Sequence, residues 1–116
     1  MRKLVLSNYM AKSKVPDQAK IGNLLDIEYP YPVKDSILTL LFSRELKLTG
    51  AELVRQQALA LKIEACKEDE ILLEDAEWQR LKHAVETCTG FNRQDIELVT
   101  RVLEAPVVEV GEKPKN

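Results

Sequence analysis

The sequence is poor in the residues from which catalytic and cofactor-binding sites are usually built. Its 116 residues include one histidine, two cysteines and four glycines, and no two of the glycines are adjacent. A glycine-rich phosphate-binding loop and a Gly-x-Ser-x-Gly nucleophile turn are therefore both missing. The sequence gives no positive support for an enzyme, and we expect no cofactor.

Metal-ligating residues are too few and too scattered to predict a metal site. A structural zinc site takes four ligands, usually in closely spaced pairs, whereas Cys66, His83 and Cys88 lie far apart in the chain. The acidic stretches 68–70 and 74–77 have no glycine between them, which a calcium-binding loop requires. We expect the cysteines to pack in the core, His83 to lie at or near the surface, and the acidic stretches to form a solvated turn and a helix start.

Neither an excess of one charge nor a long apolar run is present. The 17 basic and 19 acidic residues give a net charge of -2. This balance lacks the basic excess typical of nucleic-acid-binding proteins. No apolar run approaches the roughly 20 residues that span a bilayer, and the apolar start is too short for the centre of a signal peptide. We expect a cytoplasmic protein with reduced cysteines and no membrane partner.

The sequence does have the length and composition of one small domain. Apolar residues make up 45% and charged residues 31% of the chain, an ordinary globular balance. A chain of this length can bury one core. We expect a single domain over residues 1–110, with a β-hairpin region at 1–32, a helical region at 33–106 and a flexible tail at 111–116.

The N-terminal region contains two β-prone segments. Residues 3–7 form the first, and residues 24–29 form the second, which alternates in polarity as a half-buried strand does. The polar segment 10–20 between them contains Pro16 and is predicted to be a long loop, so that the two strands make a hairpin with a mobile tip. The apolar side of the second strand carries Leu25, Ile27 and Tyr29.

Two helix-start signatures define the helical region. Thr49 can cap the first turn of a helix while Glu52, three residues later, returns to the N–H of Thr49. Asn92 and Asp95 repeat this arrangement. The apolar residues expected to pack across these caps are Leu48 with Leu53, and Phe91 with Ile96.

The caps and the apolar spacing together predict four helices, at 33–44, 49–66, 75–89 and 93–104. The second is apolar on two sides, which indicates a central helix with neighbours on both flanks; its two stripes are Val54, Ala58, Leu61 and Ala65, and Leu59, Ile63 and Cys66. The third helix has a single apolar stripe, which consists of Trp78, Leu81, Val85 and Cys88. Gly90 is expected to cap its C-terminal end in the left-handed conformation. In the fourth helix, the residues expected to face the core are Ile96, Val99 and Leu103.

Two shorter apolar segments complete the fold class. Residues 71–73 form either a buried linker or a brief strand, and residues 107–110 are a strand candidate that could return to the hairpin. We therefore predict an α-dominant α+β fold, in which an N-terminal hairpin, with or without a C-terminal strand, packs on about four helices.

Two aromatic residues at the end of the hairpin are candidates for a protein contact. Tyr29 and Tyr31 alternate with two prolines, which stiffen the backbone that carries the rings. Aromatic residues are enriched at protein interfaces. The alternative is that these rings seal the hairpin over the helices.

A helix-turn-helix interpretation of helices 75–89 and 93–104 remains as an alternative function. A recognition helix must offer phosphate contacts and base-edge donors from its early residues. The helix at 93–104 carries charges of both signs, and the basic excess that drives DNA binding is missing. DNA binding is therefore the less favoured hypothesis.

The stretch from Val33 to Pro106 resembles a group of short proteins encoded by tailed bacteriophages and prophages. In that group an extended segment likewise precedes a Thr/Ser-Gly-x-Glu helix start, a Leu-Ala-x-Lys-Ile helix and a later Leu/Ile-Lys helix. The matching residues here are 33–38, 48–52, 59–63, 71–74, 81–82 and 98–105. The members have no assigned activity, so no functional residues carry over.

This resemblance implies a non-enzymatic phage protein in an infected or lysogenic bacterium. Such a protein is expected to act through protein–protein contacts, in virion assembly, as a chaperone, or by binding or inhibiting a host factor. Its expected partner is a second copy of itself or another phage or host protein, and its expected place is the host cytoplasm or the virion.

Overall fold

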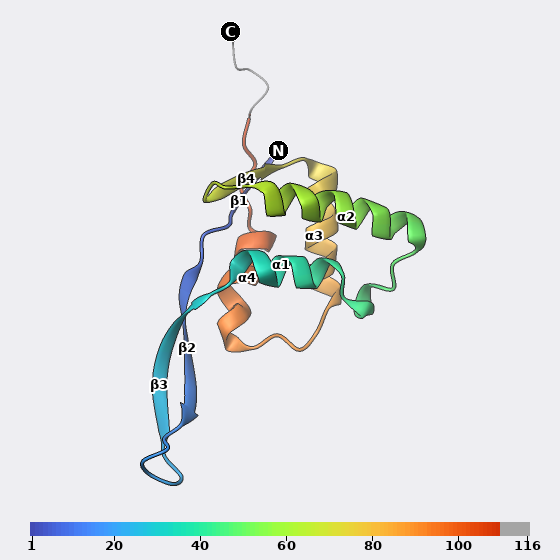
Figure 1. Cartoon of the computed structure of the whole chain (residues 1–116). Coiled ribbons are helices and arrows are strands. Elements are labelled where there is room, and N and C mark those ends of the chain that lie inside the picture. Colours follow the sequence, from blue (N-terminus) through green and yellow to red (C-terminus); the bar gives the residue numbers. More distant parts are fainter. Residues whose placement is uncertain (110–116) are drawn as a thin grey trace.

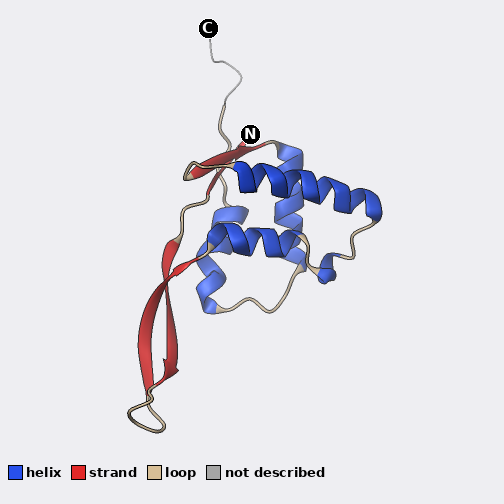
Figure 2. Ribbon diagram, in the orientation of Figure 1, coloured by secondary structure: helices blue, strands red, loops and turns tan. Residues whose placement is uncertain are grey.

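The structure is a computed structural model and describes residues 1–109. Within this range a helical body carries a projecting two-stranded β-hairpin (Figures 1 and 2). The elements are, in order, β1 (Arg2–Val5), β2 (Tyr9–Pro16), β3 (Leu24–Tyr31), α1 (Val33–Leu41), the 3₁₀ turn η1 (Arg44–Leu46), α2 (Gly50–Ala65), β4 (Glu70–Leu73), α3 (Asp75–Thr87), the 3₁₀ turn η2 (Arg93–Asp95) and α4 (Ile96–Leu103). The predicted helix-dominant α+β class is confirmed.

The strands pair differently from the predicted hairpin. β1 pairs with β4, with Leu4 opposite Ile71, and β2 pairs with β3, with Tyr9 opposite Tyr31. The prediction of a loop over 10–20 is wrong, because most of that segment is strand β2. Its alternating lysines suit a solvated strand as well as a loop, and they face acidic residues on β3. Residues 71–73 are a strand, one of the two predicted alternatives.

The C-terminal segment lies beside β1, which overlaps the first strand of the predicted hairpin, and not beside the β2–β3 hairpin. Val107 forms an isolated bridge with Arg2, the Lys3 N–H donates to the Pro106 carbonyl at 3.0 Å, and the Val108 N–H donates to the Met1 carbonyl at 2.7 Å. These bonds fix the last described residues against the body. Val110 and the predicted tail at 111–116 lie outside the described residues.

The core lies among α1, α3, α4, the β1–β4 pair and the buried side of α2. The predicted stripe of α3 is confirmed, since Trp78, Leu81, Val85 and Cys88 are all buried. The Trp78 indole N–H donates to the Val102 carbonyl at 2.8 Å, which joins α3 to α4. None of the described helices is both long enough and apolar enough to cross a membrane.

Two predicted helices differ in their ends or their phase. Helix α1 ends at Leu41, not at residue 44, because Ser43 begins the turn η1. In α4 the inward residues are Leu98 and Val102, whereas Ile96 and Leu103, predicted to point inward, are exposed and Val99 is half-buried. Both sets of apolar residues have helical spacing, so the sequence alone does not decide which one faces the core.

Helix α3 also ends earlier than predicted. It stops at Thr87, and its C-cap residue Cys88 is extended, so Gly90 does not cap it directly. Gly90 nevertheless has a φ of 86°, the left-handed conformation expected from the sequence. A glycine adopts this conformation without the steric cost of a Cβ atom, so it turns the chain toward η2.

The bounds of α2 are close to those predicted, but the helix does not lie at the centre of the fold as predicted. Thr49 accepts the Glu52 N–H at 3.2 Å and Glu52 accepts the Thr49 N–H at 2.9 Å, which confirms the capping box. The prediction of a central helix is wrong, because only the side that carries Gln56, Leu59 and Ile63 is buried. The other predicted stripe is exposed and consists of Val54, Ala58, Leu61 and Ala65.

Candidate interaction surface on the projecting arm

The hairpin of β2, β3 and the turn 17–23, here called the arm, extends away from the helical body (Figure 1). The molecule measures 62 × 36 × 22 Å, and its radius of gyration is 17.1 Å. A compact chain of this length has a radius of gyration of about 13 Å. A two-stranded hairpin is only marginally stable by itself in water, so the arm depends on what it contacts.

The turn at the tip is closed by backbone and side-chain hydrogen bonds. The Asp17 N–H donates to the Asn23 carbonyl at 2.9 Å, and the Asp17 carboxylate accepts the Ala19 N–H at 2.8 Å. Gly22 supplies a φ of 87°. Ile21, at the end of the turn, is fully exposed.

The register of the arm divides its side chains into two faces of opposite character. Residues directly opposite each other in an antiparallel pair share a face. One face, here the apolar face, carries no charge and consists of Tyr9, Ala11, Ser13, Val15, Leu25, Ile27, Tyr29 and Tyr31. The other, here the ionic face, carries all the charges of the two strands and consists of Met10, Lys12, Lys14, Pro16, Leu24, Asp26, Glu28 and Pro30.

The charges of the ionic face neutralise each other across the strands. Lys14 lies 2.6 Å from Asp26, and Lys12 lies 3.9 Å from Glu28. The hydrogen bond from Lys14 holds the pKa of Asp26 below its usual value. All four side chains are exposed, so these pairs add little stability. They do specify the register, since a slip of one residue would exchange the two faces.

The apolar face is covered at its root and exposed toward its tip. Tyr31 and Ala11 are buried and Tyr29 is half-buried. Farther out, Ile27 is 38% exposed and Leu25 is 47% exposed. The apolar face therefore continues beyond the part that the body covers.

The root of the arm is anchored on η2 by two tyrosines. The rings of Tyr9 and Tyr31 stack with centroids 4.7 Å apart. The Tyr9 hydroxyl donates to the Gln94 carbonyl at 2.5 Å, and the Tyr31 hydroxyl donates to the Asp95 carboxylate. Burial raises the pKa of both phenols, and the nearby Asp95 charge raises it further. These contacts set the angle at which the arm leaves the body.

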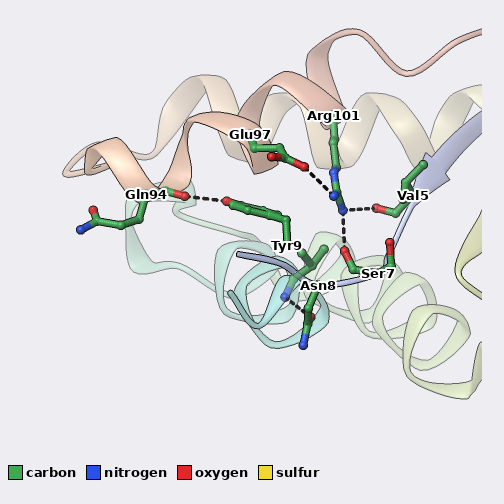
Figure 3. Close-up of polar contacts among 8 residues, drawn as sticks. Val5, Ser7, Asn8, Tyr9, Gln94, Glu97 and Arg101 are labelled. Atoms are coloured by element: carbon green, nitrogen blue, oxygen red, sulfur yellow. Dashed lines mark hydrogen bonds and ion pairs between the residues drawn. The ribbon is translucent and has the colours of Figure 1, made fainter. Parts of the chain in front are cut away.

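A second anchor holds residues 6–8, which connect β1 to the arm (Figure 3). The Arg101 guanidinium donates to the Ser7 carbonyl at 2.6 Å and to the Val5 carbonyl at 3.3 Å. It also donates to the Glu97 carboxylate at 2.6 Å. The Asn8 side chain accepts the N–H of Val33, the first residue of α1, at 3.0 Å. The arm is thus fixed in direction from both of its strands.

A hollow of about 630 Å³ opens where the arm leaves the body. Residues 12–14 and 26–28 of the arm line it together with Arg93 and Gln94 of η2. Five of these eight residues are charged and Ile27 is the one large apolar side chain among them, so the hollow is a polar surface and not a continuation of the apolar face.

Tyr29 and Tyr31, the predicted contact residues, differ in how far they are buried. Tyr31 is buried and its ring seals the arm over the body, as the second alternative expects, whereas Tyr29 is half-buried. Asp95 accepts the Asn92 N–H at 2.8 Å, which is the returning half of the predicted cap. The two-faced arm was not predicted from the sequence, although one residue separates the two lysines Lys12 and Lys14 and one separates the two acids Asp26 and Glu28, the spacing that places like charges on one face of a strand.

The three histidine and cysteine side chains do not converge within the described range. His83 is exposed, with Thr87 beside it at 3.4 Å. Cys88 is buried against Leu46 and Ala84, and Cys66 is half-buried at the edge of the main core. No group of three His, Cys, Asp or Glu side chains is placed to hold a metal ion in residues 1–109.

Comparisons of the chain with models of protein families, with curated proteins and with solved structures gave no match.

Proposed function

We propose that this chain is a non-enzymatic binding protein that holds a protein partner against the apolar face of its arm. The observation that supports this most is the division of the arm into two faces. The apolar face has no charge and is exposed to solvent at Ile27 and Leu25, and the charges of the ionic face pair with one another. Fully burying an exposed aliphatic side chain is worth about 1.5–3 kcal/mol, and because Ile27 and Leu25 are already more than half covered, each can add at most about half of that.

The anchoring of the arm also favours binding. Association is costly when a flexible segment must first be ordered. Here the tyrosine stack and the hydrogen bonds of Arg101 hold the root before any partner arrives. A partner therefore meets an apolar surface that is already positioned.

The setting we propose is a phage-infected or lysogenic bacterium, in its cytoplasm or in the virion. The resemblance over residues 33–106 supports this setting. It leaves three roles for the contact, namely virion assembly, chaperoning of a virion part, or binding of a host factor. The genes beside the coding sequence distinguish these roles, since head or tail genes favour the first two.

The alternative of a DNA-binding regulator built on α3 and α4 has less support. Arg101 is the one basic residue of α4, and its guanidinium donates to the Val5 and Ser7 carbonyls and to a carboxylate. Duplex DNA is the discriminating ligand. Affinity that falls steeply with rising salt would favour the regulator over the binding protein.

Two adjacent leucines provide the experiment. Leu25 lies on the apolar face and Leu24 on the ionic face, and both are exposed. A photo-crosslinking amino acid is placed at one position or the other and activated in the phage-carrying bacterium. We expect a defined protein adduct from position 25 and little or none from position 24. Equal adducts from both positions, or none from position 25, would refute the proposal.

A further inference from the structure

The arm has two free edges in addition to its two faces. Side chains leave a strand above and below the sheet, whereas the backbone N–H and carbonyl groups lie close to its plane. An edge strand therefore presents a row of backbone groups with which another extended chain can pair. β2 forms one edge of the arm and β3 forms the other.

The register shows which backbone groups of β2 point outward. In an antiparallel pair of strands, residue pairs that exchange hydrogen bonds alternate with pairs that do not. The Asp17 N–H donates to the Asn23 carbonyl at 2.9 Å, one pair beyond the end of the β2–β3 ladder. By this alternation the N–H groups of Met10, Lys12 and Lys14 point away from β3. None of the three donates to another backbone element within residues 1–109.

The two prolines of the arm agree with this alternation. Pro16 and Pro30 have no N–H, and both occupy positions of the outward-pointing class, so neither removes a hydrogen bond from the ladder. Pro16 ends the free edge of β2, and residues 10–14 before it keep their N–H groups. Lysine and proline at an edge protect it from indiscriminate pairing. A partner strand must therefore be one that lysines attract.

A hollow of about 330 Å³ borders the free edge of β2. Its lining consists of residues 9–12 of β2, residues 93–94 of η2 and residues 96–97 of α4, with no residue of the described strand β3. Met10 is 59% exposed and Ile96 is 60% exposed. An extended segment that pairs with β2 thus enters a groove with an apolar side chain on each wall.

The charges around this groove favour an acidic partner. Lys12 and Arg93 line it, and Arg93 forms no ion pair within residues 1–109. The one carboxylate in the lining, that of Glu97, already accepts the Arg101 guanidinium at 2.6 Å. Lys14 follows Lys12 on the same side of the strand. Carboxylates of a partner strand would lie opposite these lysines, where opposite charges stabilise the pairing.

We propose that an extended segment of a partner protein adds to the edge of β2 as a third strand of the arm, over residues 10–14. The segment alternates acidic and aliphatic residues. Its acids lie opposite Lys12 and Lys14, and its aliphatic residues lie on the side that faces η2 and α4, toward Ile96. Strand addition of this kind takes affinity from backbone hydrogen bonds and specificity from alternate side chains. The contact goes beyond the one proposed at Leu25 and Ile27, because it uses the edge of the arm and not its apolar face.

A second copy of the chain does not suit this edge. Pairing of β2 with its own copy would set lysines opposite lysines, which is destabilising. Pairing of β2 with the acidic edge of β3 from another copy is a head-to-tail contact, which repeats from molecule to molecule into a ring or an open filament. The partner is therefore a different protein.

Nuclear magnetic resonance of the ¹⁵N-labelled chain tests the proposal with two short peptides. The probe is acetyl-Val-Glu-Val-Glu-Val-amide, and its matched control is acetyl-Val-Lys-Val-Lys-Val-amide. The acidic peptide should shift the amide resonances of residues 10–14 and slow hydrogen exchange at positions 10, 12 and 14. Its dissociation constant should be at least about tenfold lower than that of the basic peptide. Equal binding of the two peptides, or no shift at residues 10–14, overturns the proposal.

Proline substitutions separate the edge of β2 from that of β3. Lys12→Pro removes one outward N–H without interrupting the ladder and should weaken binding of the acidic peptide at least about tenfold. Glu28→Pro, directly opposite, removes an N–H from the other edge and should bind at least as tightly as the wild type. Lys12→Thr keeps the N–H but loses the charge, and should bind with intermediate affinity. Unchanged binding of Lys12→Pro overturns the proposal.

A variant on the body keeps the test decisive if a proline variant does not fold, which circular dichroism shows. Arg93 is exposed, so Arg93→Glu should fold normally. This variant should lose the preference for the acidic peptide, whereas Arg55→Glu on the exposed side of α2 should keep it. Equal behaviour of the two variants contradicts the role of the groove.

The outcomes also distinguish strand addition from the proposed function. An acidic peptide that does not bind, together with an adduct from position 25, overturns strand addition alone. Binding of the peptide with no adduct from position 25 overturns the proposed function alone. Light scattering in which the mass grows without limit as concentration rises would identify β3 of another copy as the occupant, and would overturn the choice of a different protein.

Discussion

At the scale of single residues, Asp95 links the start of a helix to the arm. Its carboxylate accepts the Asn92 N–H and the Tyr31 hydroxyl proton. The first bond is local and follows from the capping pattern in the sequence. The second spans 64 residues and depends on the tertiary fold. One carboxylate therefore serves both to begin η2 and to hold the root of β3.

The two anchoring tyrosines predict a loss of stability at alkaline pH. Burial raises the pKa of Tyr9 and Tyr31 above the ordinary value of 10.0. The neutral phenols then stabilise the fold fully below pH 10, and this stabilisation is lost as the pH rises above that value toward the folded-state pKa. Tyrosinate absorbance should show the late titration, and urea denaturation at several pH values should show the loss.

Phenylalanine substitutions provide the control for this pH dependence. In the double variant Tyr9→Phe and Tyr31→Phe both rings remain but neither hydroxyl can ionise. The stability of this variant should be lower at neutral pH, since each lost hydrogen bond is worth about 1 kcal/mol, but it should fall less above pH 10. An equally steep alkaline loss in the double variant would show that other groups cause it.

Arg101 predicts a second effect at the root of the arm. Its guanidinium donates to two backbone carbonyls and to Glu97, and the side chain is largely buried. Arg101→Met keeps most of the side-chain volume but leaves the Val5 and Ser7 carbonyls without this donor. We expect a loss of about 2 kcal/mol in the free energy of unfolding, measured by urea denaturation.

The matched control for Arg101 is Arg55→Met on the exposed side of α2. Surface substitutions away from specific contacts usually change stability by less than about 0.5 kcal/mol. Hydrogen exchange of β2 and β3 should accelerate in the Arg101 variant and stay unchanged in the Arg55 variant. Equal effects of the two substitutions would contradict the role we assign to Arg101.

At the scale of elements, the helices could be predicted from the sequence because their signals are local. The capping box at Thr49 and Glu52 lies within four residues, and the stripe of α3 repeats within a few turns. The phase of α4 could not be predicted, since its sequence has two sets of apolar residues at helical spacing and tertiary packing selects the inward one. The position of α2 at the surface of the helical body also depends on tertiary packing, because an apolar stripe in the sequence does not show whether another helix covers it.

The strand pairing could not be predicted because it is decided by contacts far apart in the chain. The paired residues of β1 and β4 are 65 to 71 positions apart, and no local pattern specifies that choice. The composition indicated Tyr29 and Tyr31 as candidate contact residues, but their burial depends on η2. The two faces of the arm become visible only when β2 and β3 are placed in register.

The capping box of α2 predicts the effect of Thr49→Ala. The substitution removes the acceptor of the Glu52 N–H and should lower the free energy of unfolding by about 1 kcal/mol. Chemical denaturation measures this loss. Thr100→Ala, at an exposed position inside α4, is the control and should have a smaller effect. A loss equal to that of the control would mean that the cap contributes nothing to the stability of α2.

At the scale of the whole molecule, the arm and the body have separate roles. The arm is joined to the core only at its root, through the tyrosine stack and the hydrogen bonds of residues 7–8. The outer strands and the turn contribute length and exposed apolar surface but no buried core residue beyond Ala11. The outer part is thus dispensable for folding and available for contact.

This division predicts that the outer arm can be removed without unfolding the body. Replacing residues 12–28 by Asn-Gly would join Ala11 to Tyr29, which are paired across the strands, through a two-residue hairpin turn. The free energy of unfolding should change by less than about 1 kcal/mol, because every deleted side chain is exposed or only partly buried. The radius of gyration, measured by small-angle X-ray scattering, should fall from 17.1 Å toward the value of about 13 Å for a compact chain. The shortened chain should keep the circular dichroism of its helices. An unfolded product would show that the outer arm stabilises the body.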